Sequence, residues 1–346
     1  MHTLTSCQGT ALHATHPRAL RRSRRRFAAV ALGALAVTLL AGPSLAQTWP
    51  GDKAIRMVIP FPPGGTSDVL GRFWAQKLSV ALGTTIVVEN RPGAGTTIAG
   101  ALVSKAAPDG YTLYFTDVTT HAITGSLYKR LPYNVEKDFT PVALVASSPL
   151  VFVVPTALPV NTMAEFIAMV KAKPGQYSYA SSGNGAILHL ATEALKAASG
   201  MEITHVPYKG SAEATTATLS GQTAASFATV PAAVPHVSAG RFKALGVTSP
   251  TRNEAFPNVP PIADTIPNYN ILLYSGILGP AGMPPAITNR INSEVSRIMK
   301  EPDTKAFYSR SGADPVDMKP AEFATQLTRL VASMGEIVKQ SGATVD

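Results

Sequence analysis

The sequence predicts an α/β protein of two lobes with a ligand cleft between them. Three observations indicate this fold class. Apolar, strand-like runs alternate with amphipathic helical runs, the alternation occurs in two successive series, and about 300 residues follow an export signal. Alternating strands and helices are typical of parallel α/β units. A chain of this length is enough for two domains of about 100–200 residues each.

The first 46 residues have the layout of a secretory signal. Six arginines precede an apolar run over residues 27–41, and small residues end at Ala46 before Gln47. The apolar run is shorter than the ~20 residues that a membrane-spanning helix needs. We therefore expect cleavage after Ala46 and a periplasmic protein. The pair Arg24-Arg25 also fits a twin-arginine signal, so the Sec and the twin-arginine routes both stay open.

Charge and cysteine content exclude several functions. The chain has 30 Lys and Arg against 21 Asp and Glu, and six of the arginines lie in the signal, which leaves a net charge of +3. That charge is too small to indicate a nucleic-acid partner. Cys7, the only cysteine, precedes the apolar run, so the mature chain has no thiolate chemistry. The histidines lack metal-ligand spacing, and Ile98 stands where a dinucleotide fingerprint needs its third glycine. We expect no cofactor and no metal.

The first series of elements runs from the signal to about residue 116. We expect strands over residues 55–59, 85–89 and 111–116, and helices over residues 68–82 and 97–107. In the first helix Leu70, Trp74 and Leu78 recur at helical spacing.

The second series has the same alternation and ends in two longer helices. We expect strands over residues 150–154, 177–180, 203–206, 224–227 and 244–247, and helices over residues 163–172, 188–198, 212–220, 286–299 and from 320 onward. In the last helix Phe323, Leu327 and Leu330 belong to one apolar face.

The turn between the first strand and the first helix has two interpretations. It reads "IPFPPGGTSDVLGRFWAQKL" over residues 59–78 and suits either a tight turn or a cradle for an anion. Gly64 and Gly65 permit positive φ and a close backbone approach, and a helix N-terminus favours a carboxylate. We expect Asp68 to organise the loop as a cap, because a second negative charge there would repel an anion. If the cradle is correct, Gly65→Val should reduce binding more than stability.

A second strand-to-helix turn, over residues 181–186, has the same small, glycine-rich and hydroxyl-bearing composition. Two facing helix N-termini, one from each lobe, could hold one carboxylate between them. An exported hydrolase with Ser182 as nucleophile and His189 as base is the alternative. The chain has neither a G-x-S-x-G elbow nor an assignable third partner for that chemistry.

Seven segments together are similar to one known family. They are "PFPPGGTSDVLGR", "VVENRPGAGTTIAG", "PDGYTL", "THAI…SLYKRLPYNVEKDFTPVALVA", "YASSGNGAILHLATEAL", "HVPYKG" and "GILGPAGMPP". In this order they resemble the Bug receptors, which are the extracytoplasmic solute-binding proteins of tripartite tricarboxylate transporters. The resemblance covers nearly all of residues 48–346.

The resemblance implies a periplasmic-binding-protein (Venus flytrap) fold of two α/β lobes joined by crossing strands. Residues 47–148 and 272–346 would form lobe 1, and residues 149–271 would form lobe 2. Such a receptor catalyses no reaction. It captures a small organic carboxylate, closes around it as a monomer and delivers it to the permease subunits in the cytoplasmic membrane. Presentation of the bound ligand to a sensor protein is the alternative.

The resemblance also implies which residues bind the ligand, largely through backbone amides, hydroxyls and bridging waters. The expected binding residues are Phe61, Pro63, Gly64, Gly65, Thr66, Ser67, Asp68, Thr120, His121, Ala122, Ser181, Ser182, Gly183, Asn184, Gly185, His189 and Tyr208.

Two departures from the family pattern bear on the ligand. Ala186 stands where Ser or Thr is usual, and Ala228-Thr229 replaces an acidic pattern that is common in relatives. Without an acid at that place, the ammonium group of an amino acid would lose a partner, which favours a plain organic or aromatic acid. None of the gripping loops has an arginine, so a fully ionised tricarboxylate is not favoured.

Overall fold

The computed structural model describes residues 49–345, and the signal predicted for residues 1–46 lies outside them. The strands are β1 (Ile55–Ile59), β2 (Ile86–Asn90), β3 (Thr112–Asp117), β4 (Phe139–Pro155), β5 (Ser178–Ser181), β6 (Thr204–Pro207), β7 (Ala225–Thr229), β8 (Phe242–Val247), β9 (Leu272–Pro280) and β10 (Asp314–Pro315). The α-helices are α2 (Thr66–Leu82), α3 (Thr97–Ser104), α4 (Val118–Leu127), α5 (Met163–Ala172), α6 (Ile187–Ser199), α7 (Ser211–Leu219), α8 (Val230–Ser238), α9 (Pro285–Ile298), α10 (Pro302–Ser311) and α11 (Pro320–Ser341). Short 3-10 turns are η1 (Ala94–Thr96) and η2 (Ile262–Asp264).

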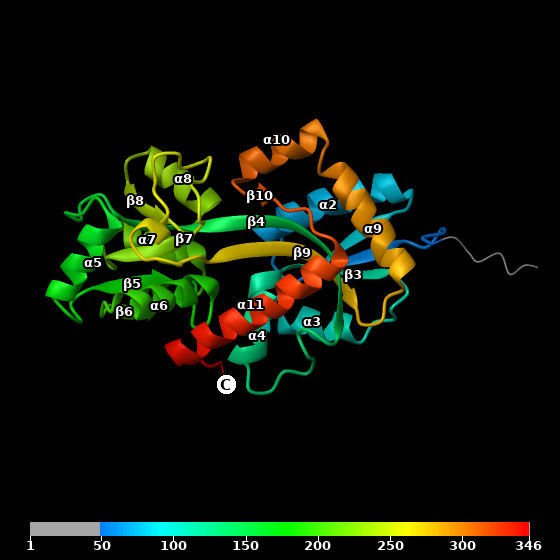
Figure 1. The fold of residues 1–346 in the computed structure, drawn as a ribbon, viewed down its shortest axis with the longest axis horizontal. Coiled ribbons are helices and arrows are strands. Elements are labelled where there is room, and N and C mark those ends of the chain that lie inside the picture. Colours follow the sequence, from blue (N-terminus) through cyan, green and yellow to red (C-terminus); the bar gives the residue numbers. More distant parts are fainter. Residues whose placement is uncertain (1–48, 346) are drawn as a thin grey trace, which may run out of the picture. The chain divides into compact units, whose positions relative to one another are not determined.

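The strands form two parallel α/β units joined through a pair of antiparallel strands. The order in the sheet is β2-β1-β3-β9-β4-β7-β5-β6, and β8 and β10 also pair with β4. Strands β1, β2 and β3 are mutually parallel, as are β5, β6 and β7. Strands β4 and β9 run antiparallel to each other and pass between the two units (Figure 1). The α/β, two-lobed fold class expected from the sequence is confirmed.

The long strand β4 belongs to both units. Its first part pairs with β9, as far as Pro149 opposite Leu272. From Leu150 opposite Thr229 onward it pairs with β7, and it also pairs with β8. The change of partner at Pro149–Leu150 supports the predicted lobe boundary, which stays a prediction.

Each unit has its own apolar core. In the first, Trp74 is fully buried and its indole Nε1 donates to the Tyr308 hydroxyl (3.1 Å), which donates to Val145 O (2.6 Å). These contacts fasten α2 and α10 to β4. In the second, Phe152 of β4 packs edge-to-face on Phe166 and Phe227. Burying one such side chain contributes about 1.5–3 kcal/mol to folding.

The C-terminal helix α11 contacts both units. Its Met334 and Val338 share an apolar cluster with Leu127 of α4 and Leu190 of α6. Figure 1 shows α11 running across the crossing strands from one unit towards the other. The helix therefore packs against both α4 and α6, and both of these helices begin at the cavity described below.

Five helices and strands were not predicted from the sequence: α4, α8, α10, β9 and the two-residue β10. Helix α8 has Pro231 in its first turn and Pro235 inside it, and proline is the least favourable residue in a helix interior. Helix α4 opens with Val118 and Thr119, which are β-branched and weak helix formers. Strand β4 also begins 11 residues earlier than expected, at Phe139 instead of residue 150.

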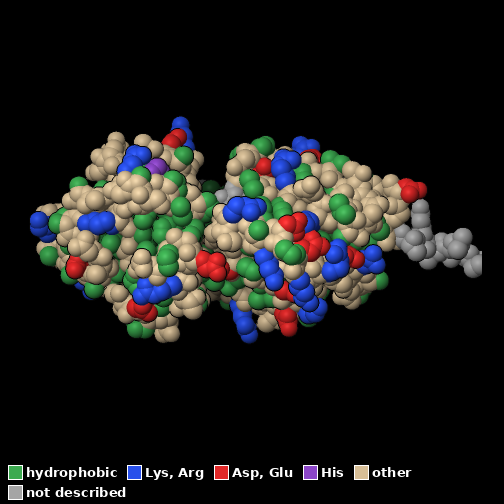
Figure 2. Space-filling view, turned by 90° about the horizontal axis from the view of Figure 1, so that it is seen from above, with side chains coloured by type: hydrophobic (Ala, Val, Ile, Leu, Met, Phe, Trp, Pro, Cys, Tyr) green, Lys and Arg blue, Asp and Glu red, His purple; other side chains and the backbone are tan. Residues whose placement is uncertain are grey.

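The surface over α2, α9 and α10 mixes acidic and basic side chains, as Figure 2 shows. Lys77 pairs with Glu301 (2.7 Å) and Asp303 (2.5 Å), and Arg297 also pairs with Glu301 (2.8 Å). This face accordingly presents no extended area of one sign. Within residues 49–345 no helix combines the length and the apolar character needed to cross a membrane.

Candidate functional site

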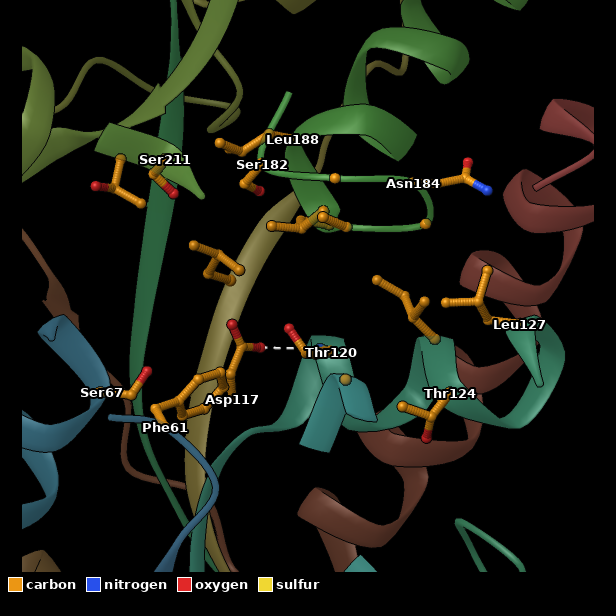
Figure 3. Close-up of a pocket in the computed structure, with 18 of the residues that line it drawn as sticks. Phe61, Ser67, Asp117, Thr120, Thr124, Leu127, Ser182, Asn184, Leu188 and Ser211 are labelled. Carbon is orange, nitrogen blue, oxygen red and sulfur yellow. Dashed lines mark hydrogen bonds between the residues drawn. The ribbon is translucent and has the colours of Figure 1, made fainter. Parts of the chain in front are cut away.

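A cavity of about 450 Å³ opens where strands β3, β5 and β7 end and helices begin (Figure 3). Both units contribute to its walls, and Ser148 of β4 and Ser275 of β9 contribute from the crossing strands. The lining residues are Phe61, Ser67, Gly95, Asp117, Thr120, Ile123, Thr124, Leu127, Tyr128, Ser148, Ser182, Gly183, Asn184, Gly185, Ala186, Ile187, Leu188, Ser211, Thr229, Pro231, Leu273, Ser275 and Val345. Ligand clefts of open α/β sheets lie at this end of the strands.

Five helices, α2, α4, α6, α7 and α8, begin at this cavity. The first turns of these helices place Ser67, Thr120, Ile187, Ser211 and Pro231 in its walls. No side chain caps the N-termini of α2, α6, α7 and α8. Their first backbone N–H groups, except at Pro231 of α8, which has none, are therefore available to a ligand, and each helix has about half a positive charge at this end. Together these groups favour an anion.

The loop before α2 is organised by Asp68, as expected, but Asp68 lies within the first turn and is not the cap, which is Gly65. Its carboxylate is 2% exposed and accepts hydrogen bonds from Gly64 N (2.9 Å), Arg72 Nε (2.9 Å) and Asn90 Nδ2 (2.7 Å). Asn90 Nδ2 also donates to Phe61 O (2.9 Å), so the loop is tied at both ends. Burial raises the pKa of Asp68, but the hydrogen bonds from Arg72, Asn90 and Gly64 outweigh it, and the pKa is lowered. Asp68 does not line the cavity.

The loop before α6 is held from behind by two stacked histidines. His189 Nδ1 accepts from Gly185 N (3.0 Å), and its ring stacks on His205 at 3.9 Å. His205 Nε2 is 2.6 Å from the Ser181 hydroxyl. Burial lowers the pKa of both histidines, that of His205 to about 4. A neutral His189 ring can accept the Gly185 hydrogen bond. The hydrolase alternative requires a hydrogen bond between Ser182 and His189. No such bond joins these residues in the described part of the chain.

The cavity brings together part of the predicted binding set. Seven predicted residues line it: Phe61, Ser67, Thr120, Ser182, Gly183, Asn184 and Gly185. Four others are buried behind its walls: His121, Ala122, Ser181 and His189. Gly64 and Gly65 line an adjoining groove beside α7 and α8, and Tyr208 lines a separate shallow groove. Pro63 lies in the exposed loop before Gly64, and Thr66 is the first residue of α2. Ligand contact by the set stays a prediction.

His121 lies outside the cavity for a clear reason. It is fully buried, its Nε2 is 2.9 Å from Val135 O, and its ring packs against Tyr133 and Phe139. Burial lowers the pKa of His121 to about 4. The ring therefore belongs to the aromatic core beneath α4.

The expectation for Gly65→Val needs correction. Gly65 has φ −75° and ψ 165°, which any residue adopts, and an added Cβ would meet nothing closer than Pro62 O at 3.8 Å. Strain is therefore expected instead at Gly64, whose φ is +86°.

Sequence reasoning missed several lining residues. They include Gly95, Asp117, Ser148, Ser211, Thr229 and Ser275. Asp117 ends a strand and caps a helix, so the rule that an Asp precedes a helix N-terminus could have found it. That signal was not used because α4 itself was not predicted.

Asp117 is the only charged side chain among the described residues that line the cavity. It is 8% exposed, and its Oδ1 accepts from Thr120 N at 3.0 Å. Burial raises the pKa of Asp117 to about 6, although hydrogen bonds from Thr120 and Thr119 lower it in part. Thr119 fixes this end of α4 to β9, since its hydroxyl donates to Leu272 O (2.9 Å) and accepts from Tyr274 N (3.0 Å).

Residues 70–343 match the family described as "Tripartite tricarboxylate transporter family receptor" (TctC). The chain belongs to this receptor family. Protein BugT of Bordetella pertussis is 33% identical to the receptor over 311 residues, which cover 89% of this chain and 95% of BugT. A UPF0065 protein from the tcbD-tcbE intergenic region of Pseudomonas sp. (strain P51) is 35% identical over 277 residues, which cover 77% of this chain and 82% of that protein. The resemblance to Bug receptors is confirmed.

Solved structures agree with the fold of the receptor. A structure described as a periplasmic transporter is 36% identical with a TM-score of 0.76, over 86% of this chain and 100% of that one. Rpa4515 of Rhodopseudomonas palustris, solved with adipate, is 31% identical with a TM-score of 0.76, over 86% and 99%. MatC from the same organism, with bound malate, is 28% identical with a TM-score of 0.71, over 82% and 98%. The receptor is thus a periplasmic solute-binding protein, and its relatives are receptors and not enzymes.

Gly185 makes a close contact between the two units of the receptor. Its φ is +72°, and an added Cβ would lie 2.5 Å from the Leu127 side chain across the cavity wall. We expect Gly185→Ala to lower the free energy of unfolding by about 1–2 kcal/mol through backbone strain. It should also weaken ligand binding about tenfold or more, because Leu127 must move where it lines the cavity. Calorimetry and chemical denaturation measure the two effects.

Gly200→Ala is the matched control. Gly200 ends the same helix with φ +67°, and an added Cβ would meet only the end of the Lys171 side chain at 3.8 Å. This variant should lose similar stability and keep the dissociation constant. Equal loss of binding in both variants would contradict a specific role for the Gly185–Leu127 contact.

Proposed function

We propose that this receptor captures a small organic carboxylate in the periplasm and delivers it to the membrane subunits of a tripartite tricarboxylate-type transporter. The convergence of four uncapped helix N-termini, those of α2, α6, α7 and α8, on a cavity with no Lys, Arg or His among its described lining residues is the observation that supports this proposal. The adipate and malate of the two Rhodopseudomonas palustris structures are both carboxylates.

The proposed anchor is made mostly of backbone groups. A carboxylate is small enough for its two oxygens to accept several hydrogen bonds from main-chain N–H groups and hydroxyls at once. Serine and threonine hydroxyls, among them Ser182 and Ser211, lie in the same walls. Charge-assisted hydrogen bonds of this kind are about twice as strong as neutral ones.

The rest of the cavity suits the carbon skeleton of the acid. Ile123, Leu127, Leu188 and Leu273 give it an apolar wall beside the polar one. A volume of about 450 Å³ is within the range of small-molecule pockets. The ligand we propose is therefore a small acid with an apolar part.

The transport cycle follows from the crossing strands. Lobe 1 (residues 47–148 and 272–346) and lobe 2 (residues 149–271) would close as hinged bodies about β4 and β9, driven by ligand contacts that exist only in the closed state. We infer that the receptor works as a monomer after export and cleavage at Ala46, by the Sec or the twin-arginine route.

A thermal-shift panel tests the proposed function. A carboxylate at ten times its dissociation constant should add about 1.4 kcal/mol to the free energy of unfolding, a shift of roughly 2 °C for a chain of this size. Uncharged sugars of similar size are the control and should give no shift. Mass spectrometry of small molecules released from the purified receptor on gentle denaturation should find an acid. Shifts by sugars and by no acid would contradict the proposal.

A further inference from the structure

One carboxylate of the protein faces the cavity in which we place a carboxylate of the ligand. Among the lining residues that the structure describes, only Asp117 has a carboxyl group, and it takes part in none of the salt bridges found within residues 49–345. An anion-binding cavity would bind better without this residue if the ligand were only an anion. The position of Asp117 therefore needs a chemical reason.

The two oxygens of Asp117 have different surroundings. Oδ1 accepts the hydrogen bond from Thr120 N that caps α4. The other oxygen points into the cavity, away from the helix, as the stick view shows (Figure 3). The Thr120 hydroxyl and Thr119 N–H, both of α4, also hydrogen-bond the carboxyl group. A carboxylate has about four acceptor positions, so capping leaves acceptor capacity directed at the cavity.

A buried carboxylate with an unused acceptor is costly unless a donor reaches it. The raised pKa of Asp117 reflects that burial. In Figure 3 Asp117 and Ser67 lie on one side of the cavity, and Ser182 and Ser211 lie on the opposite side. A ligand whose carboxylate meets the helix N-termini beside Ser182 and Ser211 would present its other end to Asp117.

We propose that Asp117 determines the ligand class by accepting a hydrogen bond from a hydroxyl or ammonium group of the bound acid. Hydroxy- and amino-carboxylates are then preferred to plain carboxylates of the same skeleton. The inference rests on the proposed capture of a carboxylate. It also changes the expectation drawn from Ala228 and Thr229, because the acid missing there is supplied from the end of β3.

The hydroxyl and the ammonium share one chemistry, a hydrogen-bond donor beside a carboxylate, and a buried acceptor discriminates strongly against ligands that lack the donor. They differ in charge. An ammonium group also neutralises Asp117, whereas a hydroxyl leaves its charge in place. A larger preference for the amino form than for the hydroxy form would identify the ammonium as the natural donor.

The test compares matched acids by isothermal titration calorimetry. The probes are three- to six-carbon mono- and dicarboxylic acids, each as the plain acid, the 2-hydroxy acid and the 2-amino acid. The unaltered receptor should bind a donor-bearing form about 10- to 100-fold more tightly than the plain acid. In Asp117→Asn the amide oxygen can keep the cap while an NH₂ group replaces the free acceptor. The preference should then fall to within about threefold, and the plain acid should bind at least as well as before.

Two further variants separate recognition from capping. Asp117→Ser can cap α4 and has no second oxygen, so it should also lose the preference. Thr162→Ala removes the side-chain cap of α5, far from the cavity, and should cost stability without changing the preference. Melting curves confirm that each variant is folded.

The outcomes distinguish this inference from the function on which it rests. If no acid of the panel binds, the proposed function fails and takes the inference with it. If plain acids bind as tightly as their hydroxy and amino forms, or if Asp117→Asn keeps the full preference, the receptor still binds carboxylates and the inference alone is overturned.

Discussion

Converting the carboxylate of the bound acid to its primary amide will weaken binding by about 30- to 1,000-fold, a cost of ~2–4 kcal/mol. The amide keeps the size of the acid but has no charge, and it turns one acceptor into a donor. At the uncapped ends of α6 and α7 that donor would face backbone N–H donors. The loss of charge also removes the attraction of the helix N-termini. Titration calorimetry of the tightest acid and its amide measures the ratio.

The methyl ester of the same acid separates the loss of charge from the introduction of a donor. It is uncharged like the amide but keeps two acceptors, so its affinity should lie between those of the acid and the amide. An amide that binds within threefold of the acid would mean that the helix N-termini do not hold the carboxylate. The loops before α2 and α6 would then be turns without a role in anion binding.

Asp117→Asn will raise the free energy of unfolding of the ligand-free receptor by about 2 kcal/mol at pH 7, and by almost nothing at pH 4. The pKa of Asp117 is raised in the folded state from 3.8 to about 6. The folded state therefore favours protonated Asp117. The resulting contribution to the free energy of unfolding is fully present below pH 3.8 and is lost as the pH rises through 6. A shift of this size corresponds to about 3 kcal/mol.

Two effects compete in that estimate. The negative charge of Asp117 at the N-terminus of α4 interacts favourably with the helix dipole, which is worth about 0.3–1 kcal/mol and is lost in the Asn variant. Burial without a cation is the larger effect, so the variant gains stability, and its melting temperature should rise by roughly 3 °C at pH 7. Chemical denaturation from pH 4 to pH 8 measures the gain. A gain that does not grow between pH 4 and pH 7 would exclude a buried ionised Asp117.

The sequence predicted those parts of the fold in which local pattern and tertiary burial agree. Helix α2 and strands β1 to β3 were predicted to within about two residues of their bounds. In α2 the apolar residues that recur at helical spacing, Leu70, Trp74 and Leu78, are also the ones that face the core. Helix α8 was missed because its two prolines oppose a helix in isolation. Strand β4 was found only in part, since the pairing of its first half with β9 is a contact distant in sequence that no local pattern encodes.

The candidate site was predictable at its loops and not at its floor. Glycine-rich turns at residues 61–68 and 181–185 indicated backbone approach to a ligand, and Ser67 and Ser182 do line the cavity. The residue pattern could not separate residues that line the cavity from residues that support its wall. Gly185 lines the cavity, whereas His189, four residues later, accepts the Gly185 N–H hydrogen bond from behind the wall. Asp117 was missed because α4, whose N-terminus it caps, was itself not predicted.

The uncapped helix N-termini have a consequence for how such a receptor can change over generations. An anchor that consists of main-chain N–H groups is present whatever side chains the first turns have, apart from proline. If the proposed anchor is correct, a single substitution can reshape the walls around Asp117, Leu127 or Leu188 without removing the grip on the carboxylate. A receptor that relied on one arginine would lose its affinity at one codon. With the proposed anchor, general affinity for acids would be robust to mutation, while the choice among acids would be free to drift and be selected.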